Sequence, residues 1–292
     1  MCLPATGWAC WSTSLPYFQP YLVLRNILGQ LIVAPFLFYS GYGVSEQIKK
    51  RGTAYVNHMP KSRILKTWIH FAIAVLIYLF LSFILKSKYA PATILLSFIG
   101  WESIGNSSWY IFAILFLYAA AYFSFKNLSG VRAPISCVIS SLLYIVVMYF
   151  AKDGSWWYDT ILCYSVGILF SCYKEEINRF LNNKYLTSCL ICLALTVAFF
   201  LLRSHLIAYE LLSIIFCIDI LLFCACVKIE NKVLFFLGKH AFEIYILQRI
   251  PMIVLSRYIS GYSFIVACFA ASIILAVAFK KIEGKVDILL KI

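Results

Sequence analysis

Two basic residues at the start of an apolar segment are the first groups in this chain whose spacing suits chemistry. Arg63 and Lys66 lie in the run Lys61-Ser62-Arg63-Ile64-Leu65-Lys66-Thr67-Trp68, and side chains three positions apart on a helix share a face. Two cations on one face can bind a phosphate, so the pair predicts a binding site for a nucleotide-like ligand. The alternative is that both side chains anchor the helix end to anionic lipid headgroups.

A serine near two glycines marks the end of the first apolar segment, in the run Pro35-Phe36-Leu37-Phe38-Tyr39-Ser40-Gly41-Tyr42-Gly43. Glycine lets a backbone or a ligand approach closely, which predicts that Ser40, Gly41 and Tyr42 line a cavity. Small residues are also common where membrane helices pack together. Both interpretations stay open at the level of sequence.

Polar residues inside apolar segments supply the remaining candidates for a cavity. Tyr245, Gln248 and Arg249 fall within one helical turn, and Asp219 is flanked by apolar residues. Intramembrane charges are costly and commonly functional, although an ion pair between Asp219 and Arg249 would be a structural alternative. Trp109 follows Asn106-Ser107-Ser108 and is either part of a site or part of an interfacial aromatic belt.

The elements that must position these residues are membrane helices. The 292 residues are 63% hydrophobic and 13% charged, with a mean hydropathy of +0.89, whereas soluble domains are about half apolar and a quarter charged. The sequence therefore predicts an all-α polytopic transmembrane bundle. A span needs about 20 mostly apolar residues, and nine segments are predicted to cross: 27–44, 67–85, 109–125, 134–151, 159–173, 186–203, 207–227, 241–257 and 262–279. The apolar stretch 91–100 is too short and is predicted to be re-entrant or to lie at the surface.

The net charge of +13 follows the loops and does not form a nucleic-acid-binding face. If the loop 45–66 is cytoplasmic, the inner loops collect 18 lysines and arginines and the outer loops 6. This bias is the positive-inside rule, and it predicts an N-terminus outside and a C-terminus in the cytoplasm. We expect one membrane-embedded domain over 1–292, with an outer tail at 1–26 and a cytoplasmic tail at 280–292.

The cysteines and histidines show no metal-site spacing, so we expect no metal and no bound cofactor. Cys189 and Cys192 form a C-x-x-C on an apolar segment, where cysteine packs as a small hydrophobe. Cys2 and Cys10 would share the outer side and could pair.

Taken in order, the segments resemble the integral-membrane acyltransferase 3 family over most of the chain. Five short motifs carry the resemblance, and their shared order is more specific than any one of them. The motifs are Phe36–Gly43, similar to F-F-x-x-S-G-[FY]; Arg63-x-x-Lys66, similar to Arg-x-x-Arg; the tryptophan-led Ser108–Phe112; Tyr164–Phe170, similar to F-x-x-G-x-x-F; and Leu237–Gln248, similar to L-G-(x)n-I-Y-x-x-H.

The resemblance implies a bundle of about ten helices. The abundance of lysine, tyrosine, isoleucine and asparagine is typical of a bacterial protein, which we expect in the inner membrane. A member of this family takes an acyl group, most often acetyl, from cytoplasmic acyl-CoA and delivers it to a hydroxyl of an exported glycan or lipid-linked sugar. It implies O-acetylation of a cell-envelope polysaccharide, with Arg63 and Lys66 binding the donor and Ser40–Tyr42 shaping the active-site funnel. Membrane lipids are the other expected partners, and nucleic acid is not one.

Two positions depart from the family pattern. The family's first helix carries a basic residue and then a catalytic histidine, and this sequence begins after the point where that helix should lie. None of His58, His70, His205 and His240 matches that motif, and Gln248 stands where relatives have histidine. Hydroxyl acylation without a base forfeits roughly 10²–10⁴-fold in rate. Together with the outside N-terminus, this predicts either a longer natural protein or a degenerate, inactive member.

Two other classes of function are compatible with an apolar bundle. A transporter or flippase of amphiphilic substrates would also need intramembrane charges, but it predicts an internal repeat and paired discontinuous helices, and neither is clear in the sequence. A non-catalytic membrane scaffold would tolerate the missing histidine, but it explains Arg63, Lys66 and Tyr245–Arg249 only as anchors.

Overall fold

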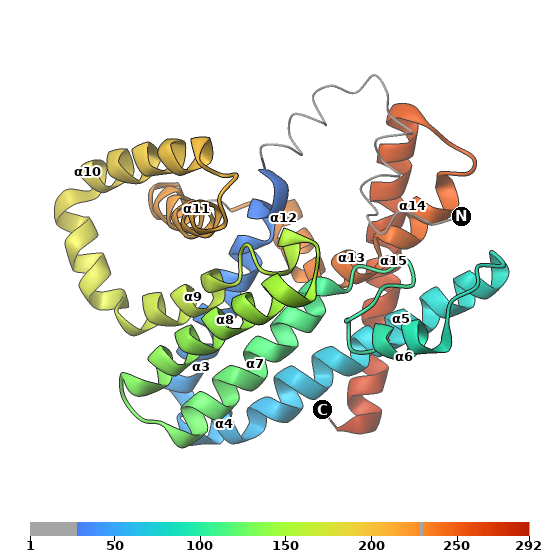
Figure 1. Cartoon of the computed structure of the whole chain (residues 1–292), viewed down its shortest axis with the longest axis horizontal. Helices are drawn as coiled ribbons and strands as arrows, with labels where there is room; N and C mark the ends of the chain where they lie inside the picture. The colour runs from blue at the N-terminus through green and yellow to red at the C-terminus, as the bar shows by residue number, and fades with distance from the viewer. Residues whose placement is uncertain (1–27, 228–229, 292) are drawn as a thin grey trace. The chain divides into compact units, whose positions relative to one another are not determined.

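The computed structural model describes residues 28–227 and 230–291, and within them every regular element is helical (Figure 1). The expected outer tail at 1–26, with Cys2 and Cys10, lies outside the described residues. The helices are α3 (Ala34–Arg51), α4 (Thr53–Met59), α5 (Lys66–Ile84), α6 (Pro91–Ser97), α7 (Trp109–Asn127), α8 (Arg132–Ala151), α9 (Leu162–Cys172), α10 (Lys174–Leu201), α11 (Leu206–Cys226), α12 (Lys232–Lys239), α13 (Ala241–Leu247), α14 (Arg249–Leu255) and α15 (Gly261–Leu290). Short 3₁₀ turns lie at Gly29–Ile32 and Ser155–Trp157, and a π-helical turn at Pro60–Leu65 joins α4 to α5.

Six of these helical stretches are long and apolar enough to cross a membrane, which confirms the helical transmembrane class. They are Thr53–Ile84, Trp109–Asn127, Arg132–Ala151, Lys184–Leu201, Leu206–Ala225 and Gly261–Leu290. The other three predicted spans differ from single apolar helices. The first lies in α3, which begins at Ala34 and ends in Lys49, Lys50 and Arg51, and the span predicted at 159–173 is the 11-residue α9.

The span predicted at 241–257 is divided at Gln248 into α13 and α14, each of seven residues. Pro251 lies directly after this division, and proline removes a backbone donor and clashes with the carbonyl four residues earlier. The Tyr78 hydroxyl donates to the Ile246 carbonyl at 3.1 Å and so satisfies an acceptor at the division. Apolar composition alone does not reveal such a break.

The residues predicted as a cytoplasmic tail, 280–292, continue α15 as far as Leu290. At 1.5 Å per residue, 30 residues span about 45 Å, which exceeds the hydrocarbon core of about 30 Å. α15 is therefore long enough for the charged residues in its last turns to lie beyond the apolar layer.

The chain divides into two compact units. The first comprises the described residues of Leu65–Phe112 and Asn231–Ile292, and the second comprises Leu28–Ile64 and Ala113–Glu230. Two helical stretches, 53–84 and α7, pass from one unit to the other along the chain.

Close packing of α3 against α9 forms the centre of the second unit. A Cβ at Gly41 would lie 2.0 Å from the Tyr164 carbonyl oxygen, and one at Gly167 would lie 2.1 Å from the Phe38 carbonyl oxygen. Each glycine therefore accommodates the backbone of the other helix, as small residues do between membrane helices. Phe38 and Tyr164 are fully buried beside this crossing.

The neighbouring helices of the second unit are joined by polar contacts as well as by apolar packing. Ser141 on α8 and Ser165 on α9 lie 2.7 Å apart through their hydroxyl oxygens, and Ser165 also donates to the Cys137 carbonyl at 3.0 Å. In α10 the backbone leaves helical geometry at Lys184, where Figure 1 shows the helix turning sharply. The polar first half of α10 is thereby separated from the apolar segment Lys184–Leu201.

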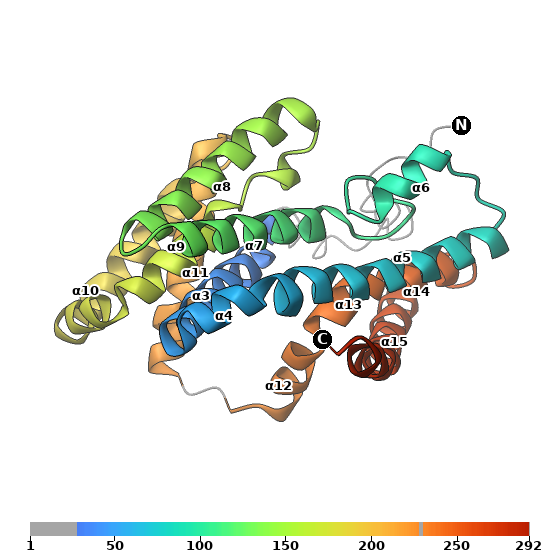
Figure 2. The same ribbon diagram turned by 90° about the horizontal axis from the view of Figure 1, so that it is seen from below.

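In the first unit, α13 packs against α15 and α5, and α14 packs against α15 (Figure 2). Ile246 and Leu247 of α13 are buried, as is Phe279 of α15. This arrangement places the polar residues of α5, α13 and α15 in contact within one unit.

At one end of the α3–α9 pair, Ser171 Oγ donates to Glu46 Oε1 at 2.7 Å, and Lys174 Nζ donates to the Tyr42 hydroxyl at 2.7 Å. The hydrogen bond from Ser171 is the largest cause that holds the pKa of Glu46 below its ordinary value of 4.5, and the charge of Lys174 acts in the same direction. The hydrogen bond to Tyr42 raises the pKa of Lys174.

We expect Glu46→Gln to lower the stability of the protein by less than about 1 kcal/mol at neutral pH, because the Glu46 side chain is partly exposed and solvent screens its interactions. A depressed folded-state pKa stabilises above the unfolded value, and this contribution is lost as the pH falls through the folded-state pKa. The difference in Tm between wild type and variant in detergent should therefore be present at pH 7 and smaller at an acidic pH below the ordinary glutamate pKa of 4.5. Glu175→Gln, at an exposed position on α10, is the control. An equal difference at both pH values would contradict the assignment.

Candidate functional site

A cavity of about 460 Å³ in the second unit, here called the Ser40 pocket, is lined by Pro35, Phe36, Tyr39, Ser40, Gly43 and Arg63. Its wall is one face of α3, the helix that carries the serine–glycine motif. Phe36 and Tyr39 are exposed and supply apolar and aromatic surface. Ser40 and Arg63 supply the polar groups, an arrangement that is typical of ligand pockets.

Arg63 is the cation of the Ser40 pocket. Its Nε donates to the Tyr55 hydroxyl at 3.0 Å, and the buried Tyr118 hydroxyl lies beside both Arg63 and Ser40. Within the described part of the chain, no carboxylate lies within ion-pair distance of the guanidinium. A half-buried cation without an anionic partner is costly, so the pocket is suited to an anionic group.

The two other residues predicted to line a cavity with Ser40 lie on different faces of α3. Gly41 packs against the α9 backbone at Tyr164, and the Tyr42 hydroxyl accepts from Lys174. The motif was predicted either to line a cavity or to pack helices together. In the structure Ser40 lines a pocket, whereas Gly41 lies where α3 packs against α9.

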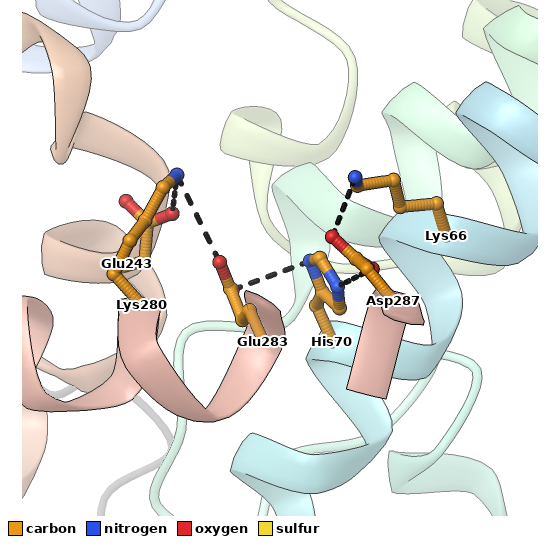
Figure 3. Close-up of polar contacts among 6 residues, drawn as sticks. All are labelled: Lys66, His70, Glu243, Lys280, Glu283 and Asp287. Atoms are coloured by element: carbon orange, nitrogen blue, oxygen red, sulfur yellow. Dashed lines mark hydrogen bonds and ion pairs between the residues drawn. The ribbon is translucent and has the colours of Figure 1, made fainter. Parts of the chain in front are cut away.

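Lys66, the second predicted donor-binding residue, makes its contact in the first unit. Its ammonium lies 2.6 Å from Asp287 Oδ2, and the Lys66 side chain is 38% exposed (Figure 3). Arg63 belongs to the π-helical turn Pro60–Leu65, whereas Lys66 begins α5. The expectation that both side chains share a face assumes a continuous α-helix, whereas the structure gives the two side chains different immediate partners.

Asp287 belongs to a chain of charged side chains that joins α5, α13 and α15. His70 Nε2 lies 2.8 Å from Asp287 Oδ1, and His70 Nδ1 lies 3.3 Å from Glu283 Oε1. Lys280 Nζ pairs with Glu243 Oε1 and lies 3.8 Å from Glu283 Oε2. Figure 3 shows the six side chains as one continuous row. Buried charges of this kind are tolerated when each has a partner of opposite sign.

Both ring nitrogens of His70 face carboxylates, and the side chain is 6% exposed. An imidazole that removes a proton from a substrate needs a nitrogen within reach of that substrate. In this geometry His70 has neither nitrogen available. His70 is therefore a link between α5 and α15.

Four of the remaining candidates lie in the first unit. Arg249 donates to the Asn106 carbonyl at 3.1 Å, and the Tyr245 ring contacts Tyr110 with centroids 5.2 Å apart. Gln248 occupies the division between α13 and α14. Trp109, the first residue of α7, stacks edge-on against Tyr110 at 6.1 Å.

Asp219, the remaining intramembrane candidate, lies in the second unit. Its Oδ2 accepts from Thr196 Oγ1 at 2.5 Å, which joins α11 to α10. Sequence reasoning offered Arg249 as a structural partner. In the structure Asp219 bonds to Thr196, and Arg249 bonds to Asn106 within its own unit.

A model of the acyltransferase domain matches residues 2–281 of the chain. The chain belongs to the acyltransferase 3 family. The match covers nearly the whole length, so it includes the helices of both units and every motif on which the resemblance was based. No curated protein and no solved structure matches the chain. Membership identifies the protein as an integral-membrane acyltransferase.

Sequence reasoning missed most of the charged row and the tyrosines around Arg63. Glu283 and Asp287 are four residues apart and so share a helical face, which was a usable signal. The predicted tail at 280–292 conceals this signal, because an irregular tail has no helical face, whereas α15 continues to Leu290. Tyr55 and Tyr118 carry no signal of this kind, since tyrosine is frequent along the chain.

Proposed function

We propose that this family member takes an acyl group, most often acetyl, from cytoplasmic acyl-CoA and transfers it to a hydroxyl of an exported glycan or lipid-linked sugar. The thioester C–S bond breaks, an ester C–O bond forms, and the hydroxyl proton ends on the released thiol. Such a protein would O-acetylate a cell-envelope polysaccharide from the bacterial inner membrane, with its C-terminus in the cytoplasm.

One observation carries the donor assignment: Arg63 lines the Ser40 pocket without a carboxylate partner among the described residues. Guanidinium binds phosphate through two parallel hydrogen bonds, and coenzyme A carries phosphates. Phe36 and Tyr39 offer apolar surface to the rest of the donor. Lys66, three residues further along the chain, is proposed as a second phosphate contact.

The positive-inside bias supports a cytoplasmic donor, because it places Arg63 and Lys66 at the inner end of a span. Acyl-CoA is a cytoplasmic metabolite, whereas the glycan hydroxyl lies on the other side of the membrane. A membrane-embedded transferase is suited to joining the two compartments.

The direct test uses the full-length natural protein in its native membrane. Inverted vesicles expose the cytoplasmic face, so externally added acetyl-CoA with a labelled acetyl group should release free thiol in step with label bound as ester to an envelope glycan. Vesicles that lack the protein are the control. Thiol release without ester formation, or neither, would contradict the proposed transfer.

Tyr55→Phe should raise the KM for acyl-CoA about three- to tenfold and leave kcat nearly unchanged, because it removes one hydrogen bond that orients the Arg63 guanidinium. Steady-state thiol release measures both constants. Tyr122→Phe, which removes a hydroxyl that accepts from Lys126 on α7, is the matched control. A change confined to kcat would argue against a role of Tyr55 in donor binding.

A further inference from the structure

A carboxylate near the C-terminal end of α15 forms an ion pair with Lys66, one of the two residues proposed to bind the donor. Asp287 Oδ2 lies 2.6 Å from the Lys66 ammonium. We propose that Asp287 competes with the donor phosphate for Lys66 and thereby determines how tightly the protein holds acyl-CoA. This inference rests on the proposed function.

Access to solvent distinguishes this pair from the rest of the charged row. Lys66 and Asp287 are 38% and 19% exposed, whereas His70, Glu283 and Glu243 are between 1% and 6% exposed. A ligand can therefore reach the Lys66–Asp287 end of the row, while the buried end remains enclosed by protein. The exposed end is the place where one anion can replace another.

The remainder of the row holds Asp287 in position for this exchange. His70 Nε2 engages the second carboxylate oxygen at 2.8 Å, and Glu283, one turn earlier on α15, engages the other ring nitrogen. When a phosphate takes the ammonium, Asp287 keeps its contact with His70 and so retains a polar partner. This lowers the cost of the exchange, since an isolated buried carboxylate would be strongly unfavourable.

Electrostatics gives the direction of the effect. A carboxylate beside a lysine attracts the ammonium and repels an incoming phosphate. Neutralising Asp287 should therefore favour donor binding, provided that Lys66 is one of the donor contacts. A lysine with no role in donor binding would give no such effect.

The test measures binding of coenzyme A to the full chain in lipid nanodiscs by isothermal titration calorimetry. Asp287→Asn should lower the Kd about fivefold, the size expected for a partly exposed ion pair. Glu176→Gln is the control, because it removes one carboxylate at an exposed position on α10 and leaves the row of Lys66, Asp287, His70 and Glu283 intact. It should leave the Kd unchanged if the effect operates through Lys66, and thermal unfolding confirms that each variant is folded.

A double-mutant comparison separates direct competition from a loosened α15. Lys66→Met should weaken binding, and adding Asp287→Asn to Lys66→Met should have no further effect. If Lys66→Met weakens binding but Asp287→Asn does not strengthen it, this inference is overturned while the donor site stands. If neither Lys66→Met nor Arg63→Met affects binding, or the wild type does not bind coenzyme A, the proposed donor site fails and the inference with it.

Discussion

Replacing both Arg63 and Lys66 with alanine should lower acyl transfer by at least about 100-fold while the protein still inserts and folds. Each hydrogen bond between a charged side chain and a phosphate contributes about 1.5–3 kcal/mol, so the loss of two cations corresponds to roughly 10²–10⁴-fold in kcat/KM. Labelled acetyl incorporation into envelope glycan measures the loss. Titration of acyl-CoA should show that most of the loss in kcat/KM comes from a higher KM, because the cations contact a part of the donor that does not react.

The matched control for this pair is Arg51→Ala with Lys61→Ala. Both residues are exposed and belong to the same basic stretch of the chain, so this variant removes two positive charges without affecting the Ser40 pocket. If both double variants lose activity equally, the pair acts through topology or through lipid headgroups. Normal transfer by the Arg63/Lys66 variant would remove both residues from the donor site.

Gly41→Ala should destabilise the second unit by about 3 kcal/mol, the upper range for overpacked interiors. A single methyl group would lie 2.0 Å from the carbonyl oxygen of Tyr164, and the obstacle is backbone of another helix, which cannot rotate away as a side chain can. The α3–α9 crossing must then separate, and the Ser40 pocket on the opposite face of α3 should lose its shape. Thermal unfolding in detergent measures the change in Tm.

Gly43→Ala is a stringent control because it lies half a turn away on the same helix and nothing lies within 4 Å of an added Cβ. Replacing glycine by alanine inside a helix is ordinarily stabilising by about 1 kcal/mol. The two variants should therefore shift Tm in opposite directions. Equal shifts would mean that helix propensity, and not the crossing with α9, governs both positions.

Several features were determined by the sequence alone, because they depend on composition or on neighbours along the chain. Mean hydropathy predicted membrane helices, and six helices of suitable length and composition confirm that class. The motifs from Phe36 to Gln248 predicted the family, which the match over residues 2–281 confirms. The predicted spans at 159–173 and 241–257 differ from the structure because a short helix and a proline-associated break leave hydropathy unchanged.

The tertiary structure alone decided which groups meet. Lys66 pairs with a residue 221 positions away, and Gly41 fits against a backbone on another helix. Neither partner can be inferred from local periodicity. Periodicity indicates which residues lie on the same face of a helix, but it does not indicate which other helix packs against that face. Ser40 and Gly41 are neighbours in the sequence but have different roles for the same reason. Ser40 lines a pocket, whereas Gly41 packs against α9, and only the position of α9 reveals this difference.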